Sequence, residues 1–122
     1  MKKLTLTLIA ACLLTLGAAN LPEQTAPKSV IHVITVAWKS GTTPEQIQAA
    51  LDGVKALPAQ YKGILRVWTR AIKVQGGKAN AIVMEFADEA ALKDYAGSPA
   101  QKEWYKAYTP IRDESTTFDV TN

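Results

Sequence analysis

The run Val30–Trp38, with the sequence VIHVITVAW, limits the possible folds of this chain more than any other segment. Its β-branched residues favour a strand, and successive side chains of a strand point to opposite sides of the sheet. A sheet with one solvated face alternates apolar and polar residues, whereas this run is apolar on both sides. We therefore expect a strand that is covered on both faces. One face carries Val30, His32, Ile34, Val36 and Trp38, and the other carries Ile31, Val33, Thr35 and Ala37.

A helix is predicted directly after this strand. Thr43 and Gln46 form the two ends of a capping box, and Pro44 occupies the first helical position between them. Apolar residues then recur at helical spacing as far as Leu57. Pro58 is expected to end the helix, because proline lacks the amide hydrogen that a helix needs.

Two further strands are predicted at residues 63–74 and 81–87, joined by the glycine-rich stretch QGGKAN at residues 75–80. The strand at 81–87 is again apolar on both faces. Ile82, Met84 and Phe86 lie on one side, and Ala81 and Val83 lie on the other.

The last third of the chain predicts a second helix and a final strand. Asp88 is expected to cap the helix, Gly97 interrupts it, and a second capping box at Ser98–Gln101 restarts it. Residues 115–121 then form a plausible last strand. The order is β-α-β-β-α-β, which predicts an α+β, ferredoxin-like protomer with both helices on one face of the sheet.

The helices of one chain can cover only one face of such a sheet. Because the strands are apolar on both faces, a second copy packed sheet on sheet is the simplest cover, and we expect a homodimer. The alternative is a monomer with a poorly solvated sheet, which would be prone to aggregation.

Residues 1–19 are predicted to be a secretory signal peptide. Lys2 and Lys3 precede an apolar run that is too short to span a bilayer, and small residues up to Ala19 follow it. Residues 20–28 are then a flexible leader and residues 29–122 the folded domain. The exported product would be periplasmic or secreted, with no stable membrane insertion after signal cleavage. In a competing interpretation, Cys12 is the lipidated N-terminus of a lipoprotein.

Removal of the signal peptide also limits which partners, metals and cofactors the remaining domain is expected to bind. The only cysteine leaves with it, as do two of the three net positive charges, so a nucleic-acid partner is not expected. One histidine without cysteines or spaced carboxylates cannot form a closed metal site, and we expect no metal. No phosphate-binding loop or other cofactor motif is present in the sequence, so no cofactor is expected.

Several stretches in order resemble the stress-responsive A/B barrel (Dabb) domains, a branch of the dimeric α+β barrels. They are HVITVAWKSGTTPEQI, ALPAQYKGI, AIVMEFADEAALKDYAGSPAQ and TFDV, and they cover the chain from about Ser29 to Thr121. The resemblance implies a ferredoxin-like protomer whose sheet faces that of a partner. It implies no single activity, because most members have no assigned reaction and the wider superfamily includes cofactor-free monooxygenases.

A plant member of the family is a polyketide cyclase that uses a first-strand histidine, a tyrosine and a second histidine in a Pro-Ala-His motif. By this resemblance His32 and Tyr95 match the first two positions and are the candidate catalytic residues. The third position is Gln101, in Pro99-Ala100-Gln101. Because glutamine cannot act as a general base, the two-histidine mechanism is not expected here. Gln101 is equally explained as the partner of Ser98 in the capping box.

Our leading hypothesis is a dimer that binds a small apolar or aromatic molecule in a cavity between helices and sheet. The alternatives are a cofactor-free enzyme that uses His32 and Tyr95, and a purely structural role in which His32 is an ordinary buried histidine. Whether the protein is an enzyme stays open. The predicted ligand-binding residues are Ile34, Val36, Trp38, Ile82, Met84 and Gln101.

Overall fold

The structure of the chain is a computed structural model that describes residues 27–122. The predicted signal peptide, the alternative lipidation at Cys12 and most of the predicted leader lie outside the described residues. The elements in chain order are β1 (Val30–Trp38), α1 (Pro44–Gln60), β2 (Ile64–Trp68), β3 (Asn80–Phe86), α2 (Glu89–Tyr95), α3 (Pro99–Tyr108) and β4 (Arg112–Val120). No helix of this part of the chain is both long enough and apolar enough to cross a bilayer.

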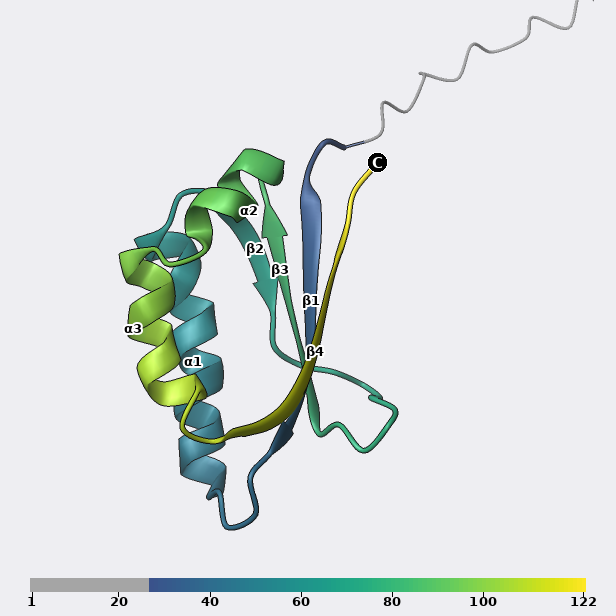
Figure 1. Cartoon of the computed structure of the whole chain (residues 1–122), viewed down its shortest axis with the longest axis vertical. Coiled ribbons are helices and arrows are strands. Elements are labelled where there is room, and N and C mark those ends of the chain that lie inside the picture. Colours follow the sequence, from purple (N-terminus) through teal and green to yellow (C-terminus); the bar gives the residue numbers. More distant parts are fainter. Residues whose placement is uncertain (1–26) are drawn as a thin grey trace, which may run out of the picture.

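The strands form one antiparallel sheet in the order β2-β3-β1-β4. Figure 1 shows the helices gathered on one face of this sheet, while no helix or strand of residues 27–122 covers the other face. The predicted α+β, ferredoxin-like protomer is thereby confirmed, with the second helical segment divided into α2 and α3. Gly97, which has a φ of 77°, lies at that division and provides the left-handed turn that most other residues disfavour.

The core lies between the helices and the face of the sheet that carries Val30, Ile34 and Val36 on β1. These three side chains are at most 5% exposed. Their contribution to stability is large, because full burial of one such side chain is worth about 1.5–3 kcal/mol. The buried partners from the other elements include Val54, Leu57, Ile82, Met84, Phe86, Tyr95, Trp104 and Tyr108.

Local signals placed the helix starts correctly. The hydroxyl of Thr43 accepts from the amide of Gln46, whose side chain accepts in turn from the amide of Thr43, which is the predicted capping box. Ser98 likewise accepts from the amide of Gln101. The side chain of Gln101 accepts from the amide of Gly97, one residue earlier than a standard box requires.

Three predicted boundaries differ from the structure by more than one residue, and one of them is the start of β4, which lies at Arg112 instead of residue 115. Helix α1 continues to Gln60, past Pro58, because Pro58 lies in the last turn, where the chain closes with a bond from the Tyr61 amide to the Leu57 carbonyl. Strand β2 ends at Trp68 instead of residue 74. Trp68 forms the last pair, with Val83, and the β3 residues before Val83 pair only with β1, so the chain leaves the sheet after Trp68.

The uncovered face of the sheet is partly apolar and partly charged. Trp68, Phe118 and Val120 are about half-exposed on it, at 45%, 50% and 53%. Glu85 also lies on this side but is only 5% exposed, and the guanidinium of Arg66 donates to its carboxylate at 2.5 Å. This hydrogen bond lowers the pKa of Glu85 and outweighs the opposing effect of burial.

Candidate functional site

His32 is held by a carboxylate on the neighbouring strand. The register of the sheet places His32 of β1 opposite Asp119 of β4, so both side chains point to the helix side. The imidazole Nδ1 lies 2.6 Å from the carboxylate oxygen Oδ1 of Asp119. The His32 side chain is 16% exposed and that of Asp119 is 44% exposed. The pair is therefore reachable from solvent through Asp119.

The rest of the imidazole packs against the core. The edge of one ring meets the face of the other between His32 and Phe86, with ring centres 5.8 Å apart. With Nδ1 engaged by Asp119, Nε2 is the ring nitrogen left for another partner. A carboxylate on one nitrogen favours the tautomer that carries its proton there, so Nε2 is set up as a hydrogen-bond or proton acceptor.

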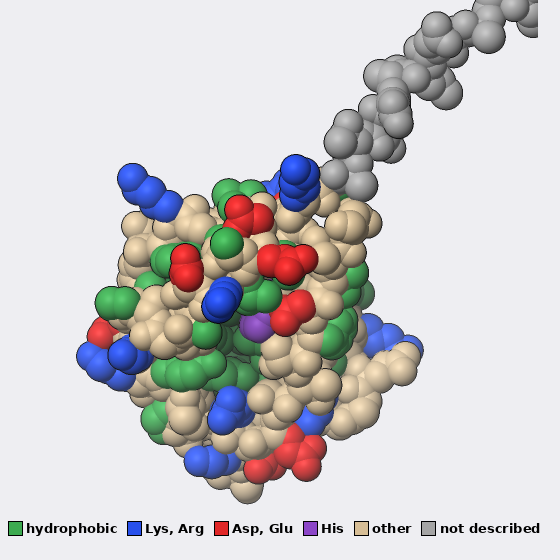
Figure 2. Space-filling model, turned by 45° about the horizontal axis from the view of Figure 1, so that its top comes forward, with side chains coloured by type: hydrophobic (Ala, Val, Ile, Leu, Met, Phe, Trp, Pro, Cys, Tyr) green, Lys and Arg blue, Asp and Glu red, His purple; other side chains and the backbone are tan. Residues whose placement is uncertain are grey.

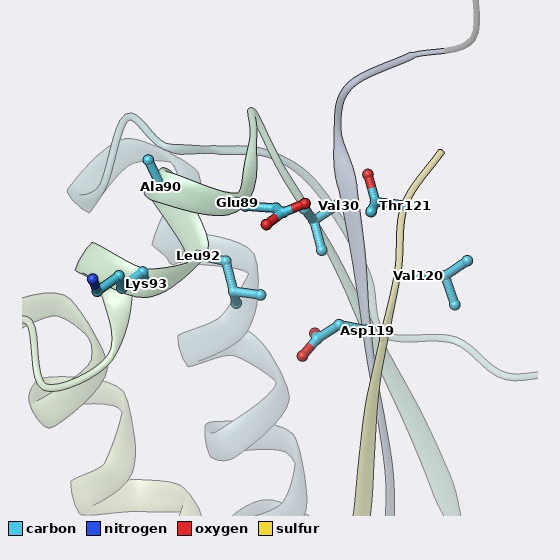
Figure 3. A pocket seen from close by; sticks show the side chains of 8 residues that line it. All are labelled: Val30, Glu89, Ala90, Leu92, Lys93, Asp119, Val120 and Thr121. Atoms are coloured by element: carbon cyan, nitrogen blue, oxygen red, sulfur yellow. The ribbon is translucent and has the colours of Figure 1, made fainter.

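A pocket opens next to this pair, between α2 and the ends of β1 and β4. Its cavity volume is about 430 Å³, which is within the range of small-molecule sites. Figure 3 shows Leu92 pointing inward from α2 and the Asp119 carboxylate pointing toward the helix side, while the Val120 side chain turns away. The lining is contributed by Val30, Glu89, Ala90, Leu92, Lys93, Asp119, Val120 and Thr121.

The imidazole can be seen from outside the molecule. Figure 2 shows the single histidine among the described residues at the floor of a hollow, with hydrophobic side chains beside it and charged side chains around the opening. An apolar cavity with few convergent polar groups is the usual form of a small-molecule site.

Tyr95 lies deeper than a pocket residue. It is 2% exposed, and its ring packs against Phe86 at a centre distance of 5.2 Å, so that Phe86 contacts both Tyr95 and His32. Its hydroxyl has no hydrogen-bond partner among the described residues. Burial strongly raises the pKa of Tyr95, so the phenol stays protonated at physiological pH. Its predicted catalytic role stays a prediction. The residue that contacts the imidazole nitrogen of His32 is Asp119.

The predicted ligand-binding residues belong mainly to the core. Ile34, Val36, Ile82 and Met84 are at most 5% exposed, and none of them lines the pocket. The side chains that the sequence placed around a central cavity instead fill that space, and the pocket lies nearer the end of the sheet.

The other two predicted ligand-binding residues have structural partners. The indole nitrogen of Trp38 donates to the side chain of Asn80 at 2.7 Å, and its ring meets Tyr108 edge-on. Gln101 bonds to Gly97, at the start of α3, and its side-chain nitrogen lies 3.3 Å from the Tyr105 hydroxyl. Neither lines the pocket.

Sequence reasoning missed Asp119, Leu92 and Val120 as site residues. Asp119 left a weak signal, since it interrupts the apolar alternation of Phe118 and Val120 with a charge that must point to the opposite side. Its pairing with His32 depends on a register between segments 87 residues apart, which no local pattern reveals.

The model of the stress responsive A/B barrel domain matches residues 30–122. The chain belongs to this family. No curated protein matches it in sequence. Within residues 27–122 no group of three or more histidine, cysteine, aspartate or glutamate side chains is arranged to hold a metal ion.

Several solved structures share the fold. A hydroxynitrile lyase from Passiflora edulis superposes with a TM-score of 0.70 at 17% identity, covering 79% of this chain and 94% of the lyase. A mutant of SnoaB, a cofactor-independent oxygenase from Streptomyces nogalater, gives 0.60 at 15% identity, covering 78% and 93%.

A dimeric protein of unknown function from Bacteroides fragilis gives a TM-score of 0.65 at 16% identity, covering 80% of this chain and all of that protein. At such identities the likeness shows a common fold, and enzymes are among the proteins that have it.

Proposed function

We propose that this domain binds a small, largely apolar or aromatic molecule in the pocket between α2 and the β1–β4 end of the sheet. The observation that carries the proposal is an apolar cavity of about 430 Å³ with the Asp119 carboxylate on its wall and His32 bonded to that carboxylate. Leu92, Val30 and Ala90 provide contact area for a hydrocarbon body, and the Asp119 carboxylate, which His32 holds from behind the lining, fixes its orientation.

Titration with 2-phenylethanol, followed by the NMR signals of the Leu92 methyl groups and the His32 ring, tests this binding. Leu92→Glu places a charge inside the pocket and should abolish the shifts. The control is Ala49→Glu, an exposed substitution on α1, which should leave them intact. Shifts that spread evenly over the surface, or that persist in Leu92→Glu, would refute binding in this pocket.

A second function, acid–base catalysis without a cofactor, is favoured by the 2.6 Å contact between His32 and Asp119. In this reaction, Nε2 of His32 takes a proton from a weakly acidic C–H bond of the bound molecule and returns a proton to the same carbon. Asp119 keeps the imidazole in the required tautomer and stabilises the cation that forms. Both the lyase and the oxygenase above show that the fold supports enzymes.

Deuterium exchange into the methyl group of acetophenone, measured by NMR in heavy water, reports this proton transfer directly. We expect His32→Asn to remove the exchange above background and Asp119→Asn to slow it by about 10²-fold, the low end of acid–base contributions. Tyr95→Phe tests the predicted catalytic role of this buried tyrosine: slower exchange would support the role, and an unchanged rate would assign the proton transfer to His32 and Asp119 alone. Exchange that is indifferent to His32→Asn would rule out catalysis by this residue.

We further propose that the protein is a homodimer packed sheet on sheet. The support is the uncovered sheet face with Trp68, Phe118 and Val120 half-exposed, together with the dimeric state given for similar structures. Export to the periplasm or the exterior is a separate proposal that rests on residues 1–19 alone, and fractionation of cells that produce the full chain tests it.

A further inference from the structure

The polar groups on the pocket wall are mainly carboxylates. Figure 3 shows the Glu89 carboxylate extending from α2 toward β1 and the Asp119 carboxylate directed toward the helix side. Lys93 lines the same wall, but its ammonium group points away from Val30 and Asp119. The cavity therefore presents hydrogen-bond acceptors to a ligand, while the ammonium group of Lys93, the one cation among the lining residues, lies outside it.

We infer that the pocket selects apolar molecules whose polar end is an amine, and that it discriminates against carboxylic acids. This inference rests on the proposed ligand-binding function and specifies its ligand class. Ionised carboxylates only accept hydrogen bonds, so an ammonium group satisfies them, whereas a ligand carboxylate would face like charge. The hydrocarbon part of the ligand lies on Val30, Ala90 and Leu92.

The charge balance at the opening favours the same class of ligand. Oδ1 of Asp119 is bonded to His32, which leaves its second carboxylate oxygen for a ligand. Glu89 takes part in none of the ion pairs formed among residues 27–122. In either protonation state of His32, the pair of His32 and Asp119 carries no net positive charge, and Glu89 adds one negative charge to it.

The positive features nearby are not available to an anion inside the pocket. The start of α2, where free amides would attract an anion, is capped by Asp88, which accepts from the amide of Ala91 at 2.8 Å. Lys28 lies in an adjoining groove that it shares with Asp88 and Glu89. The cations at this end of the molecule are therefore outnumbered by carboxylates around the opening.

The test compares three ligands with the same ring: 2-phenylethylamine, 2-phenylethanol and 3-phenylpropanoate, titrated into the full-length domain at neutral pH. We expect the amine to bind about two- to tenfold more tightly than the alcohol, as two partly exposed charge pairs allow. The carboxylate should bind more weakly than the alcohol. Glu89→Gln should weaken amine binding about two- to fivefold and weaken alcohol binding less, so that the preference for the amine over the alcohol shrinks.

The matched control is Glu103→Gln, an exposed glutamate on α3 that pairs with Lys106 instead of lining the pocket. It should leave the order of the three ligands unchanged, and thermal melts of both variants check that they fold. If the alcohol binds but the amine binds no better, or the carboxylate binds best, the inferred ligand class is wrong. Binding of a small molecule in the pocket is then still supported. If the alcohol does not bind either, the proposed function and this inference both fail.

Discussion

Replacement of Phe118 by aspartate should separate the proposed dimer into monomers. Phe118 lies on the uncovered sheet face and is 50% exposed in the single chain. A phenylalanine buries roughly 200 Å² when fully covered, so about 100 Å² of its apolar surface would be removed from water by a partner. At about 25 cal/mol per Å², this is about 2.5 kcal/mol for each subunit.

A two-fold interface contains the residue twice, because the same patch serves both subunits. The loss is then about 5 kcal/mol for the dimer, which corresponds to a dissociation constant about 10³- to 10⁴-fold larger. Burial of two aspartates adds to this loss. Tyr105→Asp is the control, since Tyr105 is a similarly exposed aromatic residue, at 36%, on the opposite, helical side.

Sedimentation equilibrium between 1 and about 100 μM, a range suited to such a shift, measures the result. We expect a dimer mass for the parent chain and for Tyr105→Asp, and a monomer mass for Phe118→Asp. A dimer that persists with an unchanged dissociation constant in Phe118→Asp would show that the sheet face is not the interface.

Three further predictions concern single interactions. Thr43→Ala removes the hydroxyl that caps α1 and should lower the free energy of unfolding by about 1 kcal/mol in urea titrations; no change would mean that water replaces the cap. Met84 is completely buried, so Met84→Ala should cost about 2–5 kcal/mol in the same assay, and a cost below about 1 kcal/mol would contradict the packed centre of the sheet. The hydrogen bond from Arg66 lowers the pKa of Glu85 below its ordinary value of 4.5, so this pair stabilises the fold above that pH and stops doing so as the pH falls through the lowered pKa. The melting temperature of Arg66→Gln should therefore lie below that of the parent at pH 7 and converge with it as the pH falls through the lowered pKa of Glu85, and a constant difference would exclude this ion pair as the cause.

The elements that local chemistry determines were predictable from sequence. Strand β1 was predicted with its observed ends because its nine residues, all β-branched or apolar except His32, lie between clear breaks. The starts of α1 and α3 follow from capping residues that act over three positions. The end of β2 was not predictable in this way, because it depends on how far β2 stays paired with β3, and that is a property of two paired segments.

The candidate site was only half predictable for the same reason. Alternation within one strand groups His32 with Ile34 and Val36 on one face, and the resemblance of Tyr95 to the family's pocket tyrosine predicts that this face is the helix side. Its partner Asp119 does not, because the register between β1 and β4 joins opposite ends of the domain. The predicted cavity residues Ile82 and Met84 were placed on the right face, but whether a face contains a cavity depends on how completely the helix side chains fill it.

The most direct test of the central claim is the response of the His32 ring to a ligand in the pocket. Nitrogen NMR of the labelled imidazole during titration with 2-phenylethanol measures it, because Nε2 and Nδ1 give separate signals. We expect the Nε2 signal to shift together with those of the Leu92 methyl groups, while Nδ1 stays bonded to Asp119. Saturating shifts at Leu92 with no change at Nε2 would contradict it, since the ligand would then occupy the pocket without meeting the histidine.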